Sequence, residues 1–246
     1  MPCGRSGACV IRVSEKLLDV LYQDDRYVAI NKPDGLLVHR SPIDKAETRF
    51  CVQLLRDQLG QRVYPCHRLD KPTSGVLLFA LDKESLAKAN ELFMAHAVKK
   101  TYHAVVRGWM ESSGIIDHAL KDLDEGGEVR GGGPARTQFT RIERFEIRQP
   151  VGRYPTARYS LVELTPETGR MHQLRRHMKH ANHHIIGDTR YGDGLHNRFF
   201  RERYDSHRLL LHASALSFKH PFTGEPCDIS TLPQPHDFDL KLPCAG

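Results

Sequence analysis

The chain has 246 residues, of which 39% are hydrophobic and 27% charged, with a formal net charge of +6. This size allows an ample core in one large domain or two small ones. The basic excess favours a polyanionic partner such as nucleic acid, and the alternative is a basic surface without a partner. Six scattered cysteines exclude a disulfide framework or zinc knuckle, and the lack of a membrane-length apolar run or signal peptide predicts a reduced, cytoplasmic protein with no membrane partner.

The hydrophobic pattern predicts one folded domain at residues 17–232, between a loose leader at 1–16 and a tail at 233–246. No linker or internal repeat divides this domain. The elements expected in its first half are, in chain order, a strand at 27–30, a helix at 52–59, a strand covered on both faces at 75–81, a helix from an Asp82 N-cap to about Ala97, and a strand at 101–106.

The second half is predicted to contain more strands than helices. Residues 121–134 are acidic and then glycine-rich, so we expect an exposed loop there. The remaining elements are expected to be a strand at 159–164, a helix at 169–180, and strands at 209–212 and 215–218. Runs of strands with few helices between them predict an α+β fold, a single domain with a mostly antiparallel sheet.

One segment places a carboxylate on a basic turn. Asp70 follows His67 and Arg68 and precedes Lys71, directly ahead of the strand at 75–81. An acid on such an electropositive turn suits a nucleophile or base that works beside a polyanion. The alternative is a surface ion pair, in which the carboxylate only neutralises a neighbouring cation.

A second basic segment precedes a tyrosine on the strand at 101–106. Lys99 and Lys100 lead into Tyr102. A tyrosine behind two lysines can stack on a base while the lysines contact phosphates. The alternative is a core tyrosine beside a solvated basic turn.

A third segment begins the helix expected at 169–180. Its apolar residues Met171, Leu174 and Met178 are spaced to face the core. Basic side chains are expected on the adjoining faces of the helix. These cations are Arg170, His172, Arg175, Arg176 and Lys179. An arginine here, beside a buried aspartate, would keep that carboxylate ionised, whereas the alternative is a solvated basic helix face.

A dense group of histidines follows, at positions 177, 180, 183 and 184. No acidic or cysteine ligand lies among them, so a zinc site is not expected. The glycine runs at 126–127 and 131–133 lack the Gly-Lys-Ser/Thr sequence of a phosphate-binding loop. We therefore expect neither a metal site at these histidines nor a phosphate-binding loop at these glycines.

Taken in order, the three basic segments resemble the three core motifs of the RluA-type pseudouridine synthases, a family that modifies ribosomal and transfer RNA. The resemblance extends from residue 18 to residue 229 and includes the segments at 31–35 and 185–188. It implies the pseudouridine synthase fold, a bent mixed sheet flanked by helices and loops. It also implies that the protein is an isomerase, which needs no cofactor.

The resemblance also implies roles for individual residues. Asp70 corresponds to the catalytic aspartate, Tyr102 to the tyrosine that stacks on the target uracil, and Arg175 to the arginine paired with the aspartate. Arg68 corresponds to the arginine that enters the RNA helix in place of the extruded base. The further candidates for RNA contact are His67, Lys99, Lys100, Arg170, His172 and Arg176.

The expected substrate and partner is a tRNA. About 16 residues precede the first core element, so we expect no N-terminal S4 RNA-binding domain. Residues 36–41, 53–60 and 151–159 resemble those of family members that act on uridine 65 in the T stem of tRNA. The alternatives are a dual tRNA and 23S rRNA pseudouridine synthase, a non-catalytic RNA-binding or tRNA-folding factor, and a metal-dependent RNA hydrolase, which would need clustered carboxylates.

Overall fold

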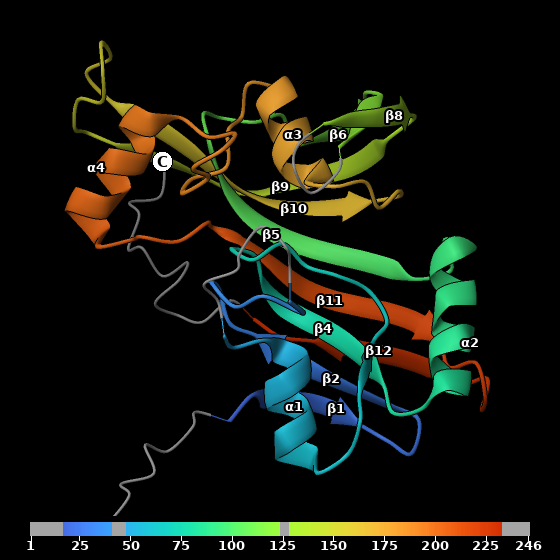
Figure 1. Cartoon of the computed structure of the whole chain (residues 1–246). Helices are drawn as coiled ribbons and strands as arrows, with labels where there is room; N and C mark the ends of the chain where they lie inside the picture. The colour runs from blue at the N-terminus through green and yellow to red at the C-terminus, as the bar shows by residue number, and fades with distance from the viewer. Residues whose placement is uncertain (1–16, 41–47, 124–127, 233–246) are drawn as a thin grey trace, which may run out of the picture.

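The computed structural model describes residues 17–40, 48–123 and 128–232, so the predicted leader at 1–16 and tail at 233–246 lie outside the described residues (Figure 1). The strands are β1 (Asp19–Gln23), β2 (Tyr27–Lys32), β3 (Tyr64–Pro65), β4 (Ser74–Ala80), β5 (Lys99–Arg107), β6 (Ser113–Asp117), β7 (Leu120–Leu123), β8 (Val129–Gly133), β9 (Arg136–Ile147), β10 (Ala157–Pro166), β11 (Leu211–Lys219) and β12 (Pro226–Ser230). The helices are α1 (Cys51–Leu59), α2 (Lys83–Met94), α3 (Gln173–His180) and α4 (Gly194–Tyr204). None of these helices is long and apolar enough to cross a membrane.

One large sheet has the strand order β1-β2-β4-β11-β5-β10-β9-β6, with β12 beside β11 and β3 beside β4. Neighbouring strands run antiparallel, except β4 and β11, which are parallel. β7 and β8 form a separate two-stranded sheet. The predicted α+β fold with a mostly antiparallel, mixed sheet is therefore confirmed.

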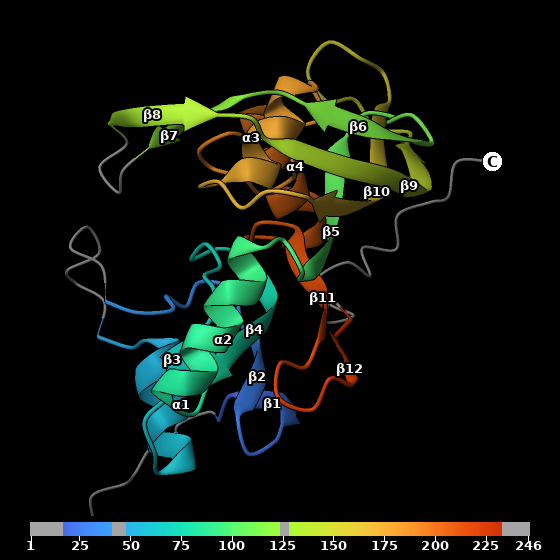
Figure 2. The ribbon, with the colours of Figure 1, turned by 90° about the vertical axis from the view of Figure 1, so that its right-hand side faces the viewer.

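The sheet carries two packed halves that meet at β5 and β11 (Figures 1 and 2). One half contains β1, β2 and β4 with α1 and α2, and the other contains β9 and β10 with α3 and α4. Tyr102 on β5 packs against a hydrophobic cluster of each half. A side chain at this junction can therefore face a cleft between the halves.

β4 is buried along all seven of its residues, as the apolar sequence predicts. It starts directly after the turn that carries Asp70. At Gly75 φ is +112°, and a Cβ there would lie 2.1 Å from the carbonyl oxygen of Ala213 on β11. Only glycine permits this approach and this conformation. The close contact between β4 and β11 therefore fixes the position of the Asp70 turn.

α2 begins as predicted, because the Asp82 side chain accepts a hydrogen bond from the backbone N–H of Ser85. It ends at Met94, earlier than the predicted end near Ala97. His96 has a φ of +54°, a left-handed conformation that stops the helix.

α3 begins later than predicted, at Gln173 instead of Gly169. The reason is again local, because His172 has a φ of +53° and stands just outside the helix. Leu174 and Met178 face the core as expected, whereas Met171 precedes the helix and borders a cavity.

The prediction of a loop at 121–134 is wrong. Lys121 pairs with Gly132 and Asp122 with Gly131 in the β7–β8 hairpin, and residues 124–127 lie outside the described residues. Backbone pairing requires no hydrophobic side chains, so the polar composition concealed these strands. The Nε of Arg170 donates to the Pro134 carbonyl, at 3.0 Å, which holds the end of the hairpin against the cleft.

Six further elements have no counterpart among the predicted elements, namely β1, β3, β6, β9, β12 and α4. The two strands predicted at 209–212 and 215–218 are one strand, β11, with an irregularity between Ala213 and Ala215. β9 alternates exposed and half-buried residues over most of its length, and many of them are charged. Its burial is therefore too weak to produce a clear hydrophobic pattern.

Candidate active site

A cavity of about 510 Å³ opens between the two halves of the sheet. The Asp70 turn and the end of α2 border it on one side, and the start of α3 borders it on the other. Figure 2 shows α2 and α3 on the same side of the bent sheet. The cavity gathers most of the predicted site residues, namely His67, Arg68, Asp70, Lys100, Tyr102, Arg170, His172 and Arg175.

The Asp70 turn is held by hydrogen bonds to its backbone carbonyls. The Asp70 carbonyl accepts a hydrogen bond from Thr73 N at 3.0 Å. The buried Lys32 Nζ donates to the Lys71 carbonyl at 3.1 Å and also to the carbonyls of Pro33 and Leu36. Since the main chain of the turn is fixed in this way, the Asp70 carboxylate faces the cavity, with 20% of the side chain exposed.

Arg175 joins Asp70 to a second, fully buried carboxylate. Its Nη1 donates to Asp70 at 3.1 Å, while Nε and Nη2 donate to Asp188 at 2.8 and 2.9 Å. Burial opposes the positive charge of Arg175, but the hydrogen bonds to both carboxylates raise its pKa above the usual value. The guanidinium therefore stays charged and offers Asp70 a charge-assisted hydrogen bond.

β5 directs Lys100 and Tyr102 into the cavity together, because residues two apart on a strand share a face. Burial and the charge of Asp70 raise the pKa of Tyr102, so its hydroxyl stays protonated. Burial lowers the pKa of Lys100, whose Nζ donates to the Thr168 carbonyl at 3.1 Å. The cavity thus presents the aromatic face of Tyr102 beside a carboxylate and the cations of Lys100 and Arg175.

His172 also faces Asp70. Its Nε2 lies 3.8 Å from Asp70 Oδ1, and its Nδ1 lies 3.1 Å from the Tyr191 hydroxyl. Burial lowers the pKa of His172, although the charge of Asp70 opposes this effect, so the ring is mostly neutral near pH 7. The Tyr191 ring also lies beside Arg175, with Cζ 5.2 Å from the ring centroid.

The structure corrects the interpretation of His67 as a cation. Its Nε2 accepts a hydrogen bond from Leu78 N at 3.1 Å, and its ring packs on Phe93 with the centroids 5.1 Å apart. Burial and the charge of Lys100 lower the pKa of His67 to about 4. His67 is therefore a neutral support for the turn and offers RNA no positive charge.

Three other predicted RNA contacts lie at or beyond the border of the cavity. Lys99 is exposed on the opposite face of β5, and Arg176 donates to the Lys121 carbonyl at 2.8 Å; neither lines the cavity. Arg170 lines it, but the guanidinium is paired with Asp122. Contact between these three cations and RNA stays a prediction.

The histidines near the end of α3 do not converge on a common point. His177, His183 and His184 each place a ring nitrogen against a backbone carbonyl, at 3.1, 2.9 and 2.7 Å. Within the described ranges, no group of three His, Cys, Asp or Glu side chains could hold a metal ion. Structural hydrogen bonds account for these three rings.

The sequence matches the profile of the family described as RNA pseudouridylate synthase over residues 26–180, and the chain belongs to that family. A relative from Vibrio parahaemolyticus named tRNA pseudouridine synthase C is 53% identical over 214 residues, which cover 85% of this chain and 87% of the relative. A relative of the same name from Haemophilus ducreyi is 50% identical over 220 residues, which cover 87% of this chain and 90% of the relative.

Solved structures with a similar fold also carry the name of this family. Human RNA Pseudouridylate Synthase Domain Containing 1 has a TM-score of 0.68 and 27% identity, and the alignment covers 89% of this chain and 84% of that one. Human RNA Pseudouridylate Synthase Domain Containing 4 has a TM-score of 0.66 and 27% identity, with 90% of this chain and 92% of that one covered. The pseudouridine synthase fold expected from the sequence motifs is confirmed.

Two residues that complete the site, Asp188 and Tyr191, have no role among those predicted from the sequence. A buried carboxylate requires a cationic or N–H partner, so an aspartate directly after the apolar run at 185–187 was an available signal. Tyr191 carried no comparable signal, because its contacts with Arg175 and His172 depend on the tertiary fold.

Proposed function

We propose that this chain isomerises uridine to pseudouridine in tRNA, at uridine 65 of the T stem, in the cytoplasm and without a cofactor. The observation that carries the proposal is the ion pair between Asp70 and Arg175 in a cavity that Tyr102 also lines. The names of the relatives support tRNA as the substrate. The resemblance of residues 151–159 to members that act on uridine 65 supports the position.

The reaction begins with extrusion of the target. A uridine stacked in a stem is not accessible, and flipping it out costs about a few kcal/mol. Arg68 is exposed at the cavity, on the turn that carries Asp70. Its guanidinium fills the gap left by the uridine and offsets part of this cost.

Asp70 then acts on the extruded nucleotide. The N1–C1′ glycosidic bond breaks, the uracil rotates, and C5 bonds to C1′. C5 loses its proton and N1, freed from the sugar, takes one up, so the product is an isomer of the substrate. Asp70 acts at C1′ of the sugar or on the uracil ring, and both routes require an ionised carboxylate. The hydrogen bond from Arg175, at 3.1 Å, stabilises that charged form.

Tyr102 holds the detached uracil. Its ring lies in the cavity beside Asp70, where it can stack on the base while the base turns. Because the pKa of Tyr102 is raised, the hydroxyl enters the reaction as a hydrogen-bond donor. Lys100, Arg170 and His172 surround the same space and contact the phosphates and sugar of the target nucleotide.

The test is tritium release from tRNA labelled with 5-³H-uridine, because loss of the C5 proton accompanies the new bond. The modified position is then mapped by carbodiimide treatment and primer extension. Release with a single stop at uridine 65 supports both the activity and the position. Release with a stop at another tRNA position, or from 23S rRNA, would keep the activity and overturn the position. Tight binding of tRNA without release would favour a non-catalytic RNA-binding factor.

A further inference from the structure

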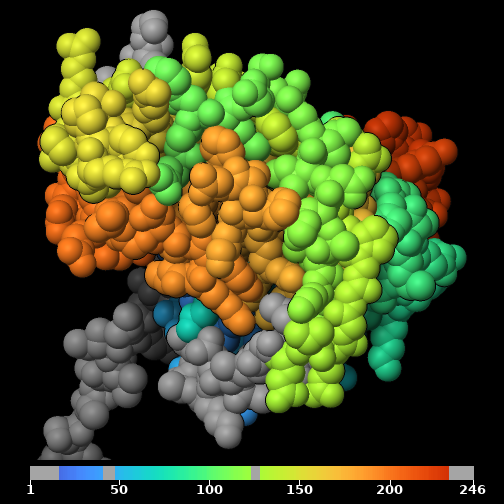
Figure 3. Space-filling view, turned by 90° about the horizontal axis from the view of Figure 1, so that it is seen from above, coloured from blue at the N-terminus to red at the C-terminus, as the bar shows by residue number. Residues whose placement is uncertain are grey.

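The end of α2 presents an apolar surface at the mouth of the cavity. Phe93, Met94 and His96 line the same cavity as Asp70. Met94 is 81% exposed, and it is the one side chain among the exposed large hydrophobics of the described residues that lines this cavity. Figure 3 shows α2 at the surface on one side of the molecule. Exposure of one methionine is ordinary, but here the side chain lies at the mouth of the cavity, where a bound substrate can cover it.

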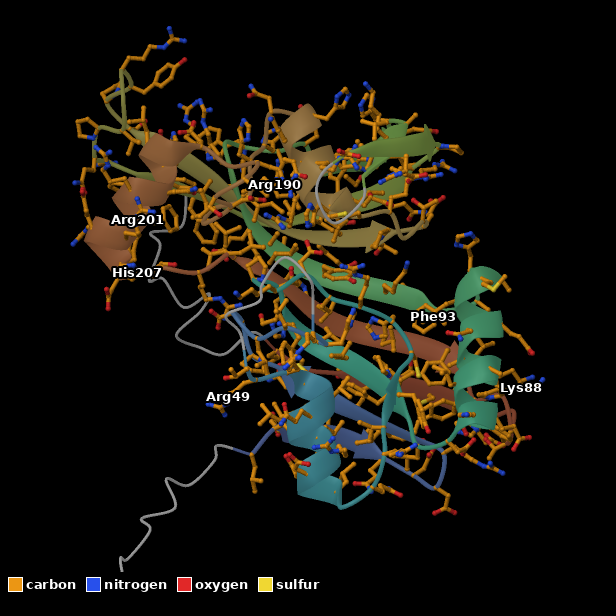
Figure 4. All side chains as sticks on the ribbon, viewed as in Figure 1. Arg49, Lys88, Phe93, Arg190, Arg201 and His207 are labelled. Carbon is orange, nitrogen blue, oxygen red and sulfur yellow. The ribbon has the colours of Figure 1, made fainter. Side chains whose placement is uncertain are left out.

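The main chain around Met94 is held in a defined position. The last turn of α2 closes with Ala95 N donating to Glu91 O at 2.9 Å and His96 N donating to Phe93 O at 3.2 Å. Phe93 then packs on the ring of His67, the residue before Arg68. Figure 4 shows Phe93 on the side of α2 that faces the sheet and Lys88 on the side that faces away. The end of α2 is therefore fixed to the turn that carries Asp70.

The chemistry of this surface differs from that of the rest of the cavity mouth. Cations such as Lys100 and Arg170 suit phosphates, whereas an apolar side chain suits the face of a base. Extrusion of a uridine uncovers the faces of the two neighbouring bases. A methionine is flexible and polarizable, so it adapts to such a face.

We propose that Met94 packs on a base next to the extruded uridine, so that the end of α2, which Phe93 anchors to His67, is a base-contacting surface of the enzyme. This inference rests on the proposed function. A protein partner fits less well, because a stable protein interface needs roughly 800 Å² on each side, whereas this surface is the end of one helix.

The test compares Met94→Ser with Met94→Leu and with a matched control, Leu195→Ser. Leu195 lies on α4, is 58% exposed and does not line the cavity. For the wild type and each variant, the Kd for a T-stem hairpin is measured over a range of salt concentrations. KM and kcat are measured by tritium release. Thermal unfolding checks that each variant is folded.

We expect Met94→Ser to raise Kd and KM roughly fivefold with little change in kcat, and Met94→Leu and Leu195→Ser to stay near wild type. The slope of log Kd against log salt should not change, because no phosphate contact is lost. Unchanged Kd and KM in Met94→Ser, or a smaller salt slope, would overturn the inference while wild-type activity stands. Failure of the wild type to release tritium would instead overturn the proposed function.

Discussion

Arg175 makes more and shorter hydrogen bonds to Asp188 than to Asp70. Arg175 donates two hydrogen bonds to Asp188, at 2.8 and 2.9 Å, and one to Asp70, at 3.1 Å. Asp188 also accepts the backbone N–H groups of Arg190 and Tyr191, both at 2.9 Å. The buried carboxylate therefore fixes the guanidinium in the orientation that leaves Nη1 directed at Asp70.

Asp188→Asn should lower kcat about 10- to 100-fold, because an amide cannot accept both N–H groups and Arg175 loses its fixed orientation. The Kd for tRNA should change much less, since Asp188 does not line the cavity with Asp70. Tritium release and RNA binding are measured together, with Asp205→Asn, at a side chain that is 96% exposed, as the control. A loss confined to KM would contradict a positioning role for Asp188.

Arg68→Gln should impair modification of a paired uridine more than modification of the same uridine in a single strand. The reason is that only the stem leaves a gap that must be filled after extrusion. The value of kcat/KM for the paired uridine, divided by that for the single-stranded uridine, should fall roughly tenfold. Arg198→Gln, at an exposed position on α4, serves as the control. Equal losses on both substrates would show that Arg68 only contacts phosphates.

Gly75→Ala should lower the free energy of unfolding by more than about 3 kcal/mol or prevent folding, because the new Cβ would meet Ala213 O at 2.1 Å. Gly60→Ala separates the steric clash from the strain of a positive φ. Gly60 also has a positive φ, +68°, but a Cβ there would have nothing within 4 Å. That control should cost only about 1 kcal/mol. Urea unfolding measures both, and equal costs would contradict the close contact between β4 and β11.

His67 should make the fold sensitive to acid. Burial and Lys100 hold its folded pKa at about 4, below the 6.5 of the unfolded chain, so between these values the unfolded state binds more protons. Stability should therefore be full above about pH 6.5 and fall by roughly 3 kcal/mol as the pH drops to 4. His67→Gln keeps an acceptor for Leu78 N and removes the titration.

Urea unfolding at pH 7.5 and pH 4.5 measures the effect. The difference in stability between the two pH values should be smaller in His67→Gln than in the wild type. His103, His177 and His196 also have lowered pKa values owing to burial, so they contribute an acid sensitivity that the variant retains. The same pH dependence in both proteins would show that His67 is not the neutral support described above.

Much of the fold could be predicted because its elements carry strong local signals. The apolar run of β4 and the Asp82 cap of α2 lie where the sequence places them. The helix ends were missed because His96 and His172 adopt left-handed conformations that residues other than glycine rarely take. The β7–β8 hairpin was missed because backbone pairing and Arg170 stabilise it, and neither leaves a hydrophobic pattern.

Some features of the site could likewise be predicted from the sequence, and others depend on the tertiary fold. Asp70, Tyr102 and Arg175 lie in motifs that can be read along the chain, and the structure brings all three to one cavity. The neutral state of His67 could not be predicted, because it depends on the Leu78 N–H and the Phe93 ring. Charge state is a property of the tertiary surroundings, and residue type alone does not define it.

In the proposed mechanism the carboxylate of Asp70 performs the chemistry while other residues hold the RNA. The most direct measurement is tritium release from 5-³H-uridine tRNA by wild type, Asp70→Asn and Asp70→Ala, with the Kd of each for the same tRNA. We predict release by the wild type alone and Kd values within about threefold of one another. Near-normal release by Asp70→Asn and Asp70→Ala would contradict the account.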